Sequence, residues 1–133
     1  MMKIVNFSLF FMLIISMGCS QSENGLSKAE MTFKQDLIYD FGKIKHFGNG
    51  TVEFEFKNTG KDPLVITNVK SSCGCTAALL SSKKLMPNEI GKLKIEFDTN
   101  NLFGQVARTV TLFSNDRKNP TRVLTLIVNI DKE

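Results

Sequence analysis

Two segments of this chain alternate apolar and polar residues one by one, and this pattern restricts the fold more than any other feature. They cover positions 51–57 and 91–98. Their apolar members are Val52, Phe54 and Phe56 in the first segment and Leu93, Ile95 and Phe97 in the second. A period of two residues places alternate side chains on opposite faces of a β-strand. Each segment is therefore predicted to be a strand with one buried face.

Other short segments have the composition of strands, and turn residues separate them. The segments rich in β-branched and other apolar residues are 31–33, 38–41, 64–69, 76–80, 106–114 and 123–130. Residues 46–50 have the composition of a turn, in which Asn49-Gly50 is the strongest signal. No stretch after the N-terminus keeps a period of 3.6 residues. The pattern predicts an all-β fold, an immunoglobulin-like antiparallel β-sandwich of about seven strands, with a small antiparallel barrel as the alternative.

Residues 1–18 have the features of a lipoprotein signal peptide. Lys3 precedes an apolar run that is too short for a membrane span of roughly 20 residues. Cys19 follows Gly18, as in a bacterial lipobox, although Ser16 stands where Leu is usual. We therefore predict cleavage before Cys19 and attachment of lipid to it. Each buried methylene of the acyl chains would contribute about 0.8 kcal/mol to membrane anchoring.

Residues 19–30 are predicted to form a flexible tether, because most of them are polar or glycine and they have no apolar period. The domain would then occupy residues 31–133. Ser20, directly after the lipidated cysteine, favours the outer membrane by the sorting rule of enteric bacteria. The predicted location is thus the cell envelope, with the protein anchored by lipid to the outer membrane and facing the periplasm.

The chain is weakly basic, and its charge restricts the partners that it can have. Its formal net charge is +4, and loss of Lys3 on cleavage would give +3 (4 − 1). Cations stand next to each other only at Lys83-Lys84 and Arg117-Lys118. This spread argues against a nucleic-acid partner and against a polybasic membrane patch. The lipid anchor is therefore the only membrane contact that the sequence predicts.

An ordered set of short motifs runs through most of the chain. They are Phe41-Gly42-Lys43-Ile44, Phe54-Glu55-Phe56-Lys57-Asn58-Thr59-Gly60, Pro63-Leu64-Val65-Ile66, Ser72-Cys73-Gly74-Cys75-Thr76, Met86-Pro87-Asn88-Glu89, Phe97-Asp98-Thr99, Gly104 and Ser114-Asn115-Asp116. In this order they resemble the DUF1573 family of bacterial exported proteins, over about residues 31 to 130. The resemblance implies an immunoglobulin-like sandwich in lipoproteins or secreted proteins of the Bacteroidota, and it implies no agreed activity. Asn88 replaces the Gly that is usual in this family, and Asn tolerates left-handed backbone nearly as well.

The motif Cys73-Gly74-Cys75, followed by Thr76, is the one stretch with the character of a chemical site. Residues i and i+2 of a strand face the same way, so the two sulfur atoms project together. One interpretation is a disulfide within the motif, because disulfides persist in an exported protein. Across a three-residue loop it would add only about 1.6 kcal/mol. Its presence would therefore indicate redox reactivity more than a role in stability.

Three other interpretations of the motif stay open. Two thiolates suit Cu(I) or Zn, but a closed Zn site needs four ligands, and His46 is the only histidine. This disfavours Zn within one chain and leaves a two-coordinate Cu(I) site, or a site shared between chains. A nucleophilic thiol would need a positioned base, for which His46 is again the only histidine. Finally, the small Cys and Gly side chains could simply pack in a tight corner between strands.

The sequence therefore predicts a module without enzyme activity that binds another protein of the cell envelope through an exposed sheet edge or its loops. It contains no Walker loop, no Ser-His-Asp set and no EF-hand pattern. The alternative function is thiol redox chemistry or Cu(I) binding by Cys73 and Cys75, with Gly74 and Thr76 supporting the motif. No cofactor other than Cu(I) is predicted.

Overall fold

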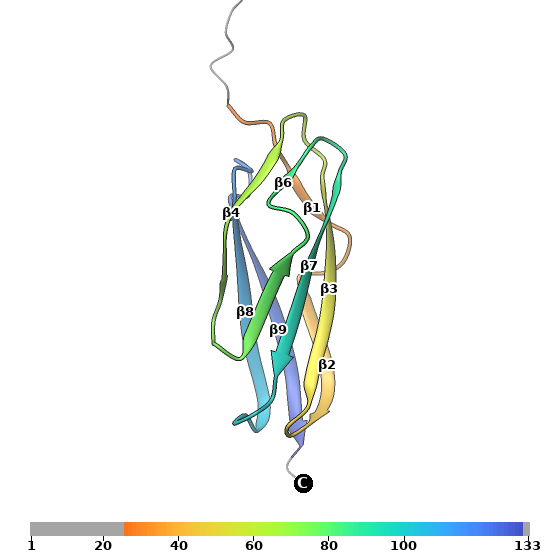
Figure 1. The fold of residues 1–133 in the computed structure, drawn as a ribbon, viewed down its shortest axis with the longest axis vertical. Helices are drawn as coiled ribbons and strands as arrows, with labels where there is room; N and C mark the ends of the chain where they lie inside the picture. The colour runs from red at the N-terminus through yellow and green to blue at the C-terminus, as the bar shows by residue number, and fades with distance from the viewer. Residues whose placement is uncertain (1–25, 132–133) are drawn as a thin grey trace, which may run out of the picture.

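The computed structural model describes residues 26–131, which form two β-sheets and no helix (Figure 1). The strands are β1 (Met31–Phe33), β2 (Ile38–Lys45), β3 (Asn49–Asn58), β4 (Leu64–Ser71), β5 (Thr76–Leu80), β6 (Lys84–Leu85), β7 (Ile90–Asp98), β8 (Gly104–Ser114) and β9 (Thr121–Asp131). One sheet has the order β1-β3-β7-β5, and the other has the order β2-β9-β8-β4-β6. The predicted all-β, immunoglobulin-like sandwich is confirmed, with more strands than the sequence had indicated.

The long axis of the molecule separates its two ends. Residues 26–30 lie at one end, and β9 finishes at the opposite end (Figure 1). The predicted signal peptide and Cys19 lie outside the described residues. Within residues 26–131, no helix is long and apolar enough to span a membrane.

The core lies between the sheets and follows the alternation of the sequence. In β3 and β7 the predicted apolar faces are buried, and the two strands pair in antiparallel register with Phe54 opposite Leu93. The last strand contributes a continuous apolar face to the same interior, formed by Leu124, Leu126, Val128 and Ile130. Burial of a large apolar side chain stabilises the fold by about 1.5–3 kcal/mol, so these three strands form the scaffold for the rest.

Pairing is antiparallel, as predicted, except between β2 and β9, which run parallel. Ile38 pairs with Thr125, and Ile44 pairs with Ile130. The register shifts between Asp40 and Lys43, where Gly42 has a left-handed φ of 67°. The short connection after β1 carries the chain to the other sheet, so that β2 lies beside β9 and not beside β1. This crossing between layers has no local sequence signal.

The turn predicted over residues 46–50 is confirmed only at its start, because Asn49 and Gly50, where the turn signal was strongest, belong to β3. The chain reverses at His46 and Phe47 instead, and Phe47 has a left-handed φ of 60°. Gly50 is buried, and a Cβ atom there would approach side-chain atoms of Ile44 and Phe41 at 2.9–3.0 Å. The glycine is therefore required for close packing and not for the turn.

Residues 26–30, the described part of the predicted tether, lie against the end of the domain. The backbone N–H of Lys28 donates to the carboxylate of Asp62 at 2.8 Å. The N–H of Lys61 donates to the carbonyl of Lys28 at 3.0 Å, and the N–H of Thr59 donates to the carbonyl of Glu30 at 2.9 Å. These bonds tie the segment that enters β1 to the connection between β3 and β4.

Asn58 lies at the centre of this end and is fully buried. Its side-chain oxygen accepts from the N–H of Gly60 at 3.0 Å and from that of Glu30 at 3.4 Å. Its side-chain N–H groups donate to the carbonyls of Asp62 and Leu85, at 2.8 and 3.0 Å. A buried amide that is satisfied in this way holds four backbone groups in place. The Asn-Thr-Gly motif is thus a structural junction.

Candidate functional site

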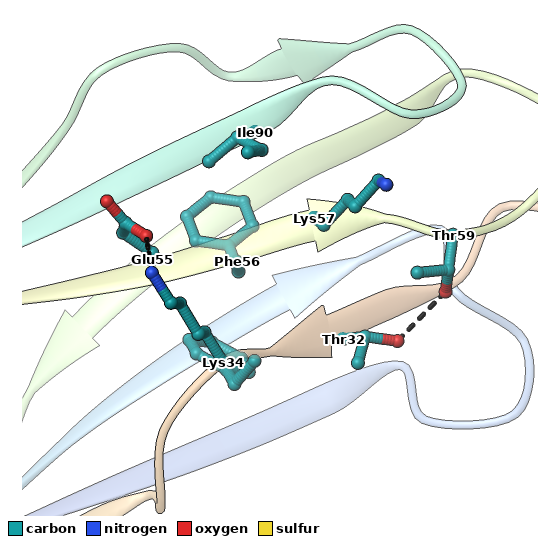
Figure 2. A pocket seen from close by; sticks show the side chains of 8 residues that line it. Thr32, Lys34, Glu55, Phe56, Lys57, Thr59 and Ile90 are labelled. Carbon is teal, nitrogen blue, oxygen red and sulfur yellow. Dashed lines mark hydrogen bonds and ion pairs between the residues drawn. The ribbon is translucent and has the colours of Figure 1, made fainter.

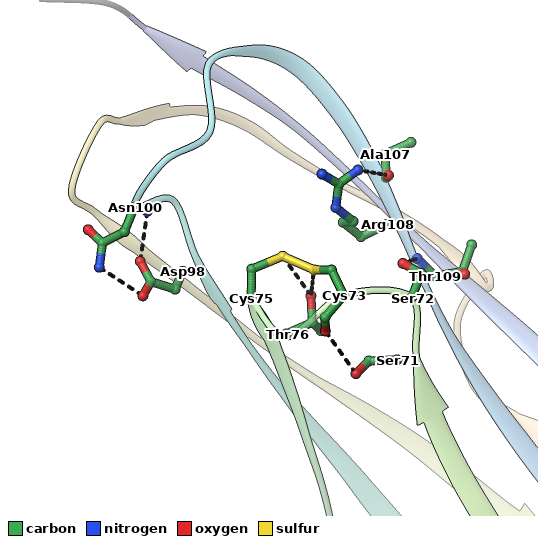
Figure 3. The surroundings of a disulfide bond; sticks show 10 residues. All are labelled: Ser71, Ser72, Cys73, Cys75, Thr76, Asp98, Asn100, Ala107, Arg108 and Thr109. Carbon is green, nitrogen blue, oxygen red and sulfur yellow. Dashed lines mark hydrogen bonds between the residues drawn. A yellow bond between two sulfur atoms is a disulfide. The ribbon is translucent and has the colours of Figure 1, made fainter.

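The Cys73-Gly74-Cys75 motif lies in the connection between β4 and β5, where the chain crosses from one sheet to the other (Figures 1 and 3). Cys73 and Cys75 form a disulfide, with their Cα atoms 5.3 Å apart. This separation lies within the usual range for disulfides. Among the four interpretations of the motif, the structure shows the bonded form.

The loop is held to both sheets, with one cysteine on each side of the crossing. Before Cys73, the N–H of Ser72 donates to the carbonyl of Thr109 in β8 at 2.8 Å, and the N–H of Thr109 donates to the Ser72 hydroxyl at 2.9 Å. After the crossing, the N–H of Asp98 in β7 donates to the carbonyl of Cys75 at 2.9 Å. Cys73 is therefore adjacent to the β8 side, and Cys75 is adjacent to the β7 side.

Thr76 lies beneath the disulfide and is only 5% exposed. Its hydroxyl oxygen is 3.6 Å from the sulfur of Cys73 and 3.8 Å from that of Cys75. Both cysteines are partly buried, and Gly74 between them is exposed. The predicted supporting residues thus have distinct positions. Thr76 offers a hydroxyl to the sulfur atoms, and Gly74 leaves open space above the loop, with no atom within 4 Å of a Cβ placed there.

A hollow of about 390 Å³ opens beside Cys75 on the surface of the four-stranded sheet. Its lining residues are Asn49, Thr51, Gly74, Cys75, Ala77, Glu96, Phe97 and Asp98. Cys75 lines this hollow and also packs against the small apolar cluster around Phe97, whereas Cys73 does not line the hollow. An approaching molecule would therefore reach Cys75 from this side.

The charges around the disulfide differ between its two ends. Arg108 belongs to its surroundings on β8, next to the Thr109 that pairs with Ser72 (Figure 3). One terminal N–H of Arg108 donates to the carbonyl of Ala107 at 2.9 Å, and its Nε atom is buried without a hydrogen-bond partner. Asp98 lies on the β7 side. Arg108 thus lies on the β8 side of the disulfide, whereas the carboxylate of Asp98 on β7 lines the hollow and turns toward Asn100 (Figure 3).

The second carboxylate of the hollow is paired. Lys94 contacts Glu96 at 2.7 Å, and the hydrogen bond that Lys94 donates to Glu96, together with the negative charge of Glu96, raises the pKa of Lys94. The carboxylate of Asp98 accepts from the backbone and side-chain N–H groups of Asn100, at 2.8 and 2.9 Å. Among the described residues, the carboxylate of Asp98 forms no ion pair with a cation.

His46, the other candidate ligand or base, is not placed to serve the cysteines. Its ring lies between those of Phe47 and Phe103, with ring centres 3.8 and 4.3 Å away. Its Nε2 atom is buried without a hydrogen-bond partner. Across residues 26–131, no three His, Cys, Asp or Glu side chains gather in a way that could hold a metal ion.

A second candidate site, which the sequence did not locate, lies at the open side of the sandwich. Within residues 26–131, β5 is an edge strand that pairs only with β7, and β4 pairs with β6 only at Leu64 and Val65. A hollow of about 290 Å³ lies between the exposed stretches of β4 and β5. Its lining residues are Ile66, Thr67, Asn68, Val69, Ala78, Leu79, Leu80 and Lys83. Leu79 is 56% exposed on this edge.

A third hollow, of about 220 Å³, lies over β1 and β3 and has an apolar floor formed by Phe33, Phe56 and Ile90 (Figure 2). The Lys34–Glu55 ion pair at 3.1 Å and the hydrogen bond between Thr32 and Thr59 at 2.8 Å cross its rim. None of its lining residues is a cysteine or histidine. It offers a small apolar recess with neither a thiol nor an imidazole in its lining.

Comparison with known proteins agrees with this architecture. The family described as "Protein of unknown function (DUF1573)" matches residues 31–130. No curated protein sequence matches the chain. A Porphyromonas gingivalis W83 protein of unknown function is similar in structure, with a TM-score of 0.68 and 18% sequence identity. The similarity covers 76% of this chain and 46% of that protein. The chain therefore spans less than half the length of that protein.

Two further structures are similar in fold. The PapD-like domain 7 of human CEP192 has a TM-score of 0.61 and 15% identity, covering 82% of this chain and 89% of that domain. The YadV chaperone has a TM-score of 0.51 and 10% identity, and the similarity covers 80% of this chain and 53% of the chaperone chain. At these identities the similarity concerns the fold alone.

Proposed function

Because this chain belongs to the DUF1573 family, which is described only as being of unknown function, we propose a function from its own geometry. It is a lipid-anchored module of the cell envelope, attached through Cys19 to the outer membrane and facing the periplasm. It binds an extended segment of another envelope protein and catalyses no reaction. The observation that carries this proposal is the unpaired edge of β5 beside the hollow between β4 and β5.

The edge of β5 has free backbone groups in a defined register. The N–H of Ser81 donates to the carbonyl of Lys92, and the N–H of Asp98 donates to that of Cys75. Because hydrogen-bonded pairs alternate in an antiparallel ladder, the backbone groups of Ala78 point away from β7. An unpaired strand edge of this kind binds extended peptides by strand addition, with side-chain pockets supplying specificity.

The hollow also defines the chemistry of the added strand. Apolar side chains of β4 and β5 line most of it, among them Ile66 and Leu80, and Lys83 is the only charged lining residue. Lys84 follows Lys83 and is exposed. We therefore expect a partner strand that places apolar residues in the hollow and a carboxylate near these two lysines. The structural similarity to the YadV chaperone shows the fold of such a scaffold but does not identify the partner.

Binding at the edge of β5 is tested by crosslinking the protein to its partners in cell envelopes, before and after a lysine is introduced on that edge. Leu79→Lys should abolish the crosslinked species that the unaltered lipoprotein forms, because a charged residue blocks strand addition. The matched control is Val123→Lys, which changes another exposed apolar residue, on β9, and should leave the crosslinks unchanged. Loss of the crosslinks with both variants, or with neither, would contradict the proposal.

A second candidate function is thiol–disulfide exchange, or Cu(I) binding by the reduced pair. The partly buried disulfide beside an open hollow favours it, since a disulfide that closes so short a loop is a poor staple. Changing both Cys73 and Cys75 to Ser should leave the fold intact and abolish thiol exchange and Cu(I) binding. An unfolded double variant would instead indicate that the disulfide is structural.

A further inference from the structure

We infer that the disulfide is a thiol-exchange site in which its two sulfur atoms have different roles. The sulfur of Cys75 accepts the attacking thiolate, and the sulfur of Cys73 is the leaving group. This inference rests on the exchange function proposed above and assigns a role to each sulfur. Its substrate class is a partner protein with two thiols, one of which lies beside a basic residue.

Access favours attack at Cys75. Cys75 lines the hollow of about 390 Å³, and Cys73 does not. An incoming thiolate must approach a disulfide sulfur directly, and access is one of the factors that set the rate of exchange. The exposed Gly74 leaves the space above the loop open. A partner thiol that enters the hollow therefore reaches the sulfur of Cys75 first.

Charge favours Cys73 as the leaving group. A nearby guanidinium stabilises a thiolate, and a nearby carboxylate destabilises it. Arg108 belongs to the surroundings of the disulfide on the β8 side, where Cys73 is tied through Ser72 (Figure 3). On the β7 side, the backbone N–H of Asp98 donates to the carbonyl of Cys75 at 2.9 Å, and Asp98 lines the hollow together with Cys75. The thiol with the lower pKa leaves faster, which assigns the leaving role to Cys73.

Thr76 places a hydrogen-bond donor beside the sulfur atom that leaves. Its buried hydroxyl is 3.6 Å from the sulfur of Cys73 and 3.8 Å from that of Cys75. Once the disulfide opens, this hydroxyl can donate a hydrogen bond to the Cys73 thiolate, and a donor to the charged form favours that form. The buried threonine and the guanidinium would then act together on the sulfur that leaves.

The exchange proceeds in two balanced steps. A thiolate of the partner attacks the sulfur of Cys75, the bond between Cys75 and Cys73 breaks, and the electron pair of that bond stays on Cys73 as a thiolate. The second thiol of the partner, once deprotonated, attacks the partner's own sulfur in the mixed disulfide and releases Cys75 as a thiolate. The partner is oxidised to a disulfide by two electrons, and the pair Cys73 and Cys75 is reduced and takes up the protons.

The hollow also selects the charge of the attacking molecule. Lys94 forms an ion pair with Glu96 at 2.7 Å, whereas the carboxylate of Asp98 accepts hydrogen bonds from Asn100 and forms no ion pair among the described residues. A thiolate that approaches alone would meet this negative charge. A cationic group beside the attacking thiol offsets the repulsion, which explains the basic residue assigned to the partner.

Small thiols of different charge test both assignments on the full-length, oxidised lipoprotein in detergent. It is treated with cysteamine, 2-mercaptoethanol or 2-mercaptoethanesulfonate at matched thiolate concentrations, quenched in acid and alkylated, and the adduct is located by peptide mass spectrometry. We expect at least about three times more adduct on Cys75 than on Cys73. The cationic thiol should react fastest and the sulfonate slowest. Asp98→Asn should reduce this difference in reaction rate, whereas Asp36→Asn should leave it unchanged.

The outcomes separate this inference from the function on which it rests. No adduct with any thiol would overturn the exchange function itself. Equal amounts of adduct on the two cysteines, or more adduct on Cys73, would be compatible with exchange but would overturn the roles assigned to Cys73 and Cys75. A reversed order of the three thiols would overturn the charge assigned to the partner.

A second measurement isolates the role of Arg108. In Cys75→Ser, the alkylation rate of Cys73 against pH gives the pKa of this thiol. Arg108→Gln should raise that pKa, and Lys70→Gln, which removes an exposed cation from β4, should leave it unchanged. Equal effects of the two substitutions would contradict the role of Arg108.

Discussion

Single buried polar side chains determine how the ends of this sandwich are closed. Asn58 satisfies the amide groups of two residues and the carbonyls of two others, and it is fully buried. At the opposite end Thr99 has a similar role, since its buried hydroxyl contacts backbone groups of Lys45 and Gly48. Asn58 ends β3 and Thr99 directly follows β7, so both stand where backbone groups leave the ladder and need other partners.

At this scale we predict that Asn58→Ala lowers the free energy of unfolding by about 2–4 kcal/mol, because it leaves buried backbone groups without partners. Urea denaturation measures the change. Asn129→Ala, which truncates an exposed Asn on β9, should change it by less than about 0.5 kcal/mol. A small effect at Asn58 would mean that water replaces its hydrogen bonds.

At the scale of elements, the short segment before β1 is fastened to the connection between β3 and β4. Gly60 makes this contact possible. A Cβ atom there would overlap the carbonyl oxygen of Lys28 and approach the backbone nitrogen of Glu30 at 2.6 Å. Since these neighbours are backbone atoms, they cannot move without breaking the hydrogen bonds around them.

We therefore predict that Gly60→Ala releases the segment 26–30 from the domain and destabilises the fold by about 2 kcal/mol. Hydrogen exchange should quicken at the amides of Lys61 and Thr59, which donate to this segment. Gly74→Ala is the control, because a Cβ there has no atom within 4 Å. Unchanged exchange in Gly60→Ala would show that the segment can shift and keep its contacts.

At the scale of the whole molecule, the two-sheet core holds the fold and the disulfide contributes little. The disulfide closes a loop of three residues, whereas the core joins strands from both ends of the chain. The double change of Cys73 and Cys75 to Ser should lower the free energy of unfolding by no more than about 2 kcal/mol. Leu126→Ala, which truncates a fully buried core residue, should cost about 2–5 kcal/mol. Urea denaturation compares the two, and a larger loss in the double Ser variant would contradict a role in exchange.

The sequence by itself determined the fold class and most strands, because a period of two residues records which face of each strand is buried. The alternation in β3 and β7 indicated buried faces that the structure shows in full. It also located the cysteine pair, since two cysteines separated by one residue are within bonding reach without help from the rest of the chain. Asn88 has a left-handed backbone with a φ of 70°, which agrees with its place where the family usually has Gly.

Only the tertiary structure decided how distant residues meet. The parallel pairing of β2 with β9, the role of Gly50 in packing and the free edge of β5 all depend on which strands become neighbours. The same holds for the cysteine site, where Arg108 comes from β8 and Asp98 comes from β7. Contacts between residues far apart in sequence leave no local period to read, so the asymmetry of the disulfide exists only once the sheets have packed.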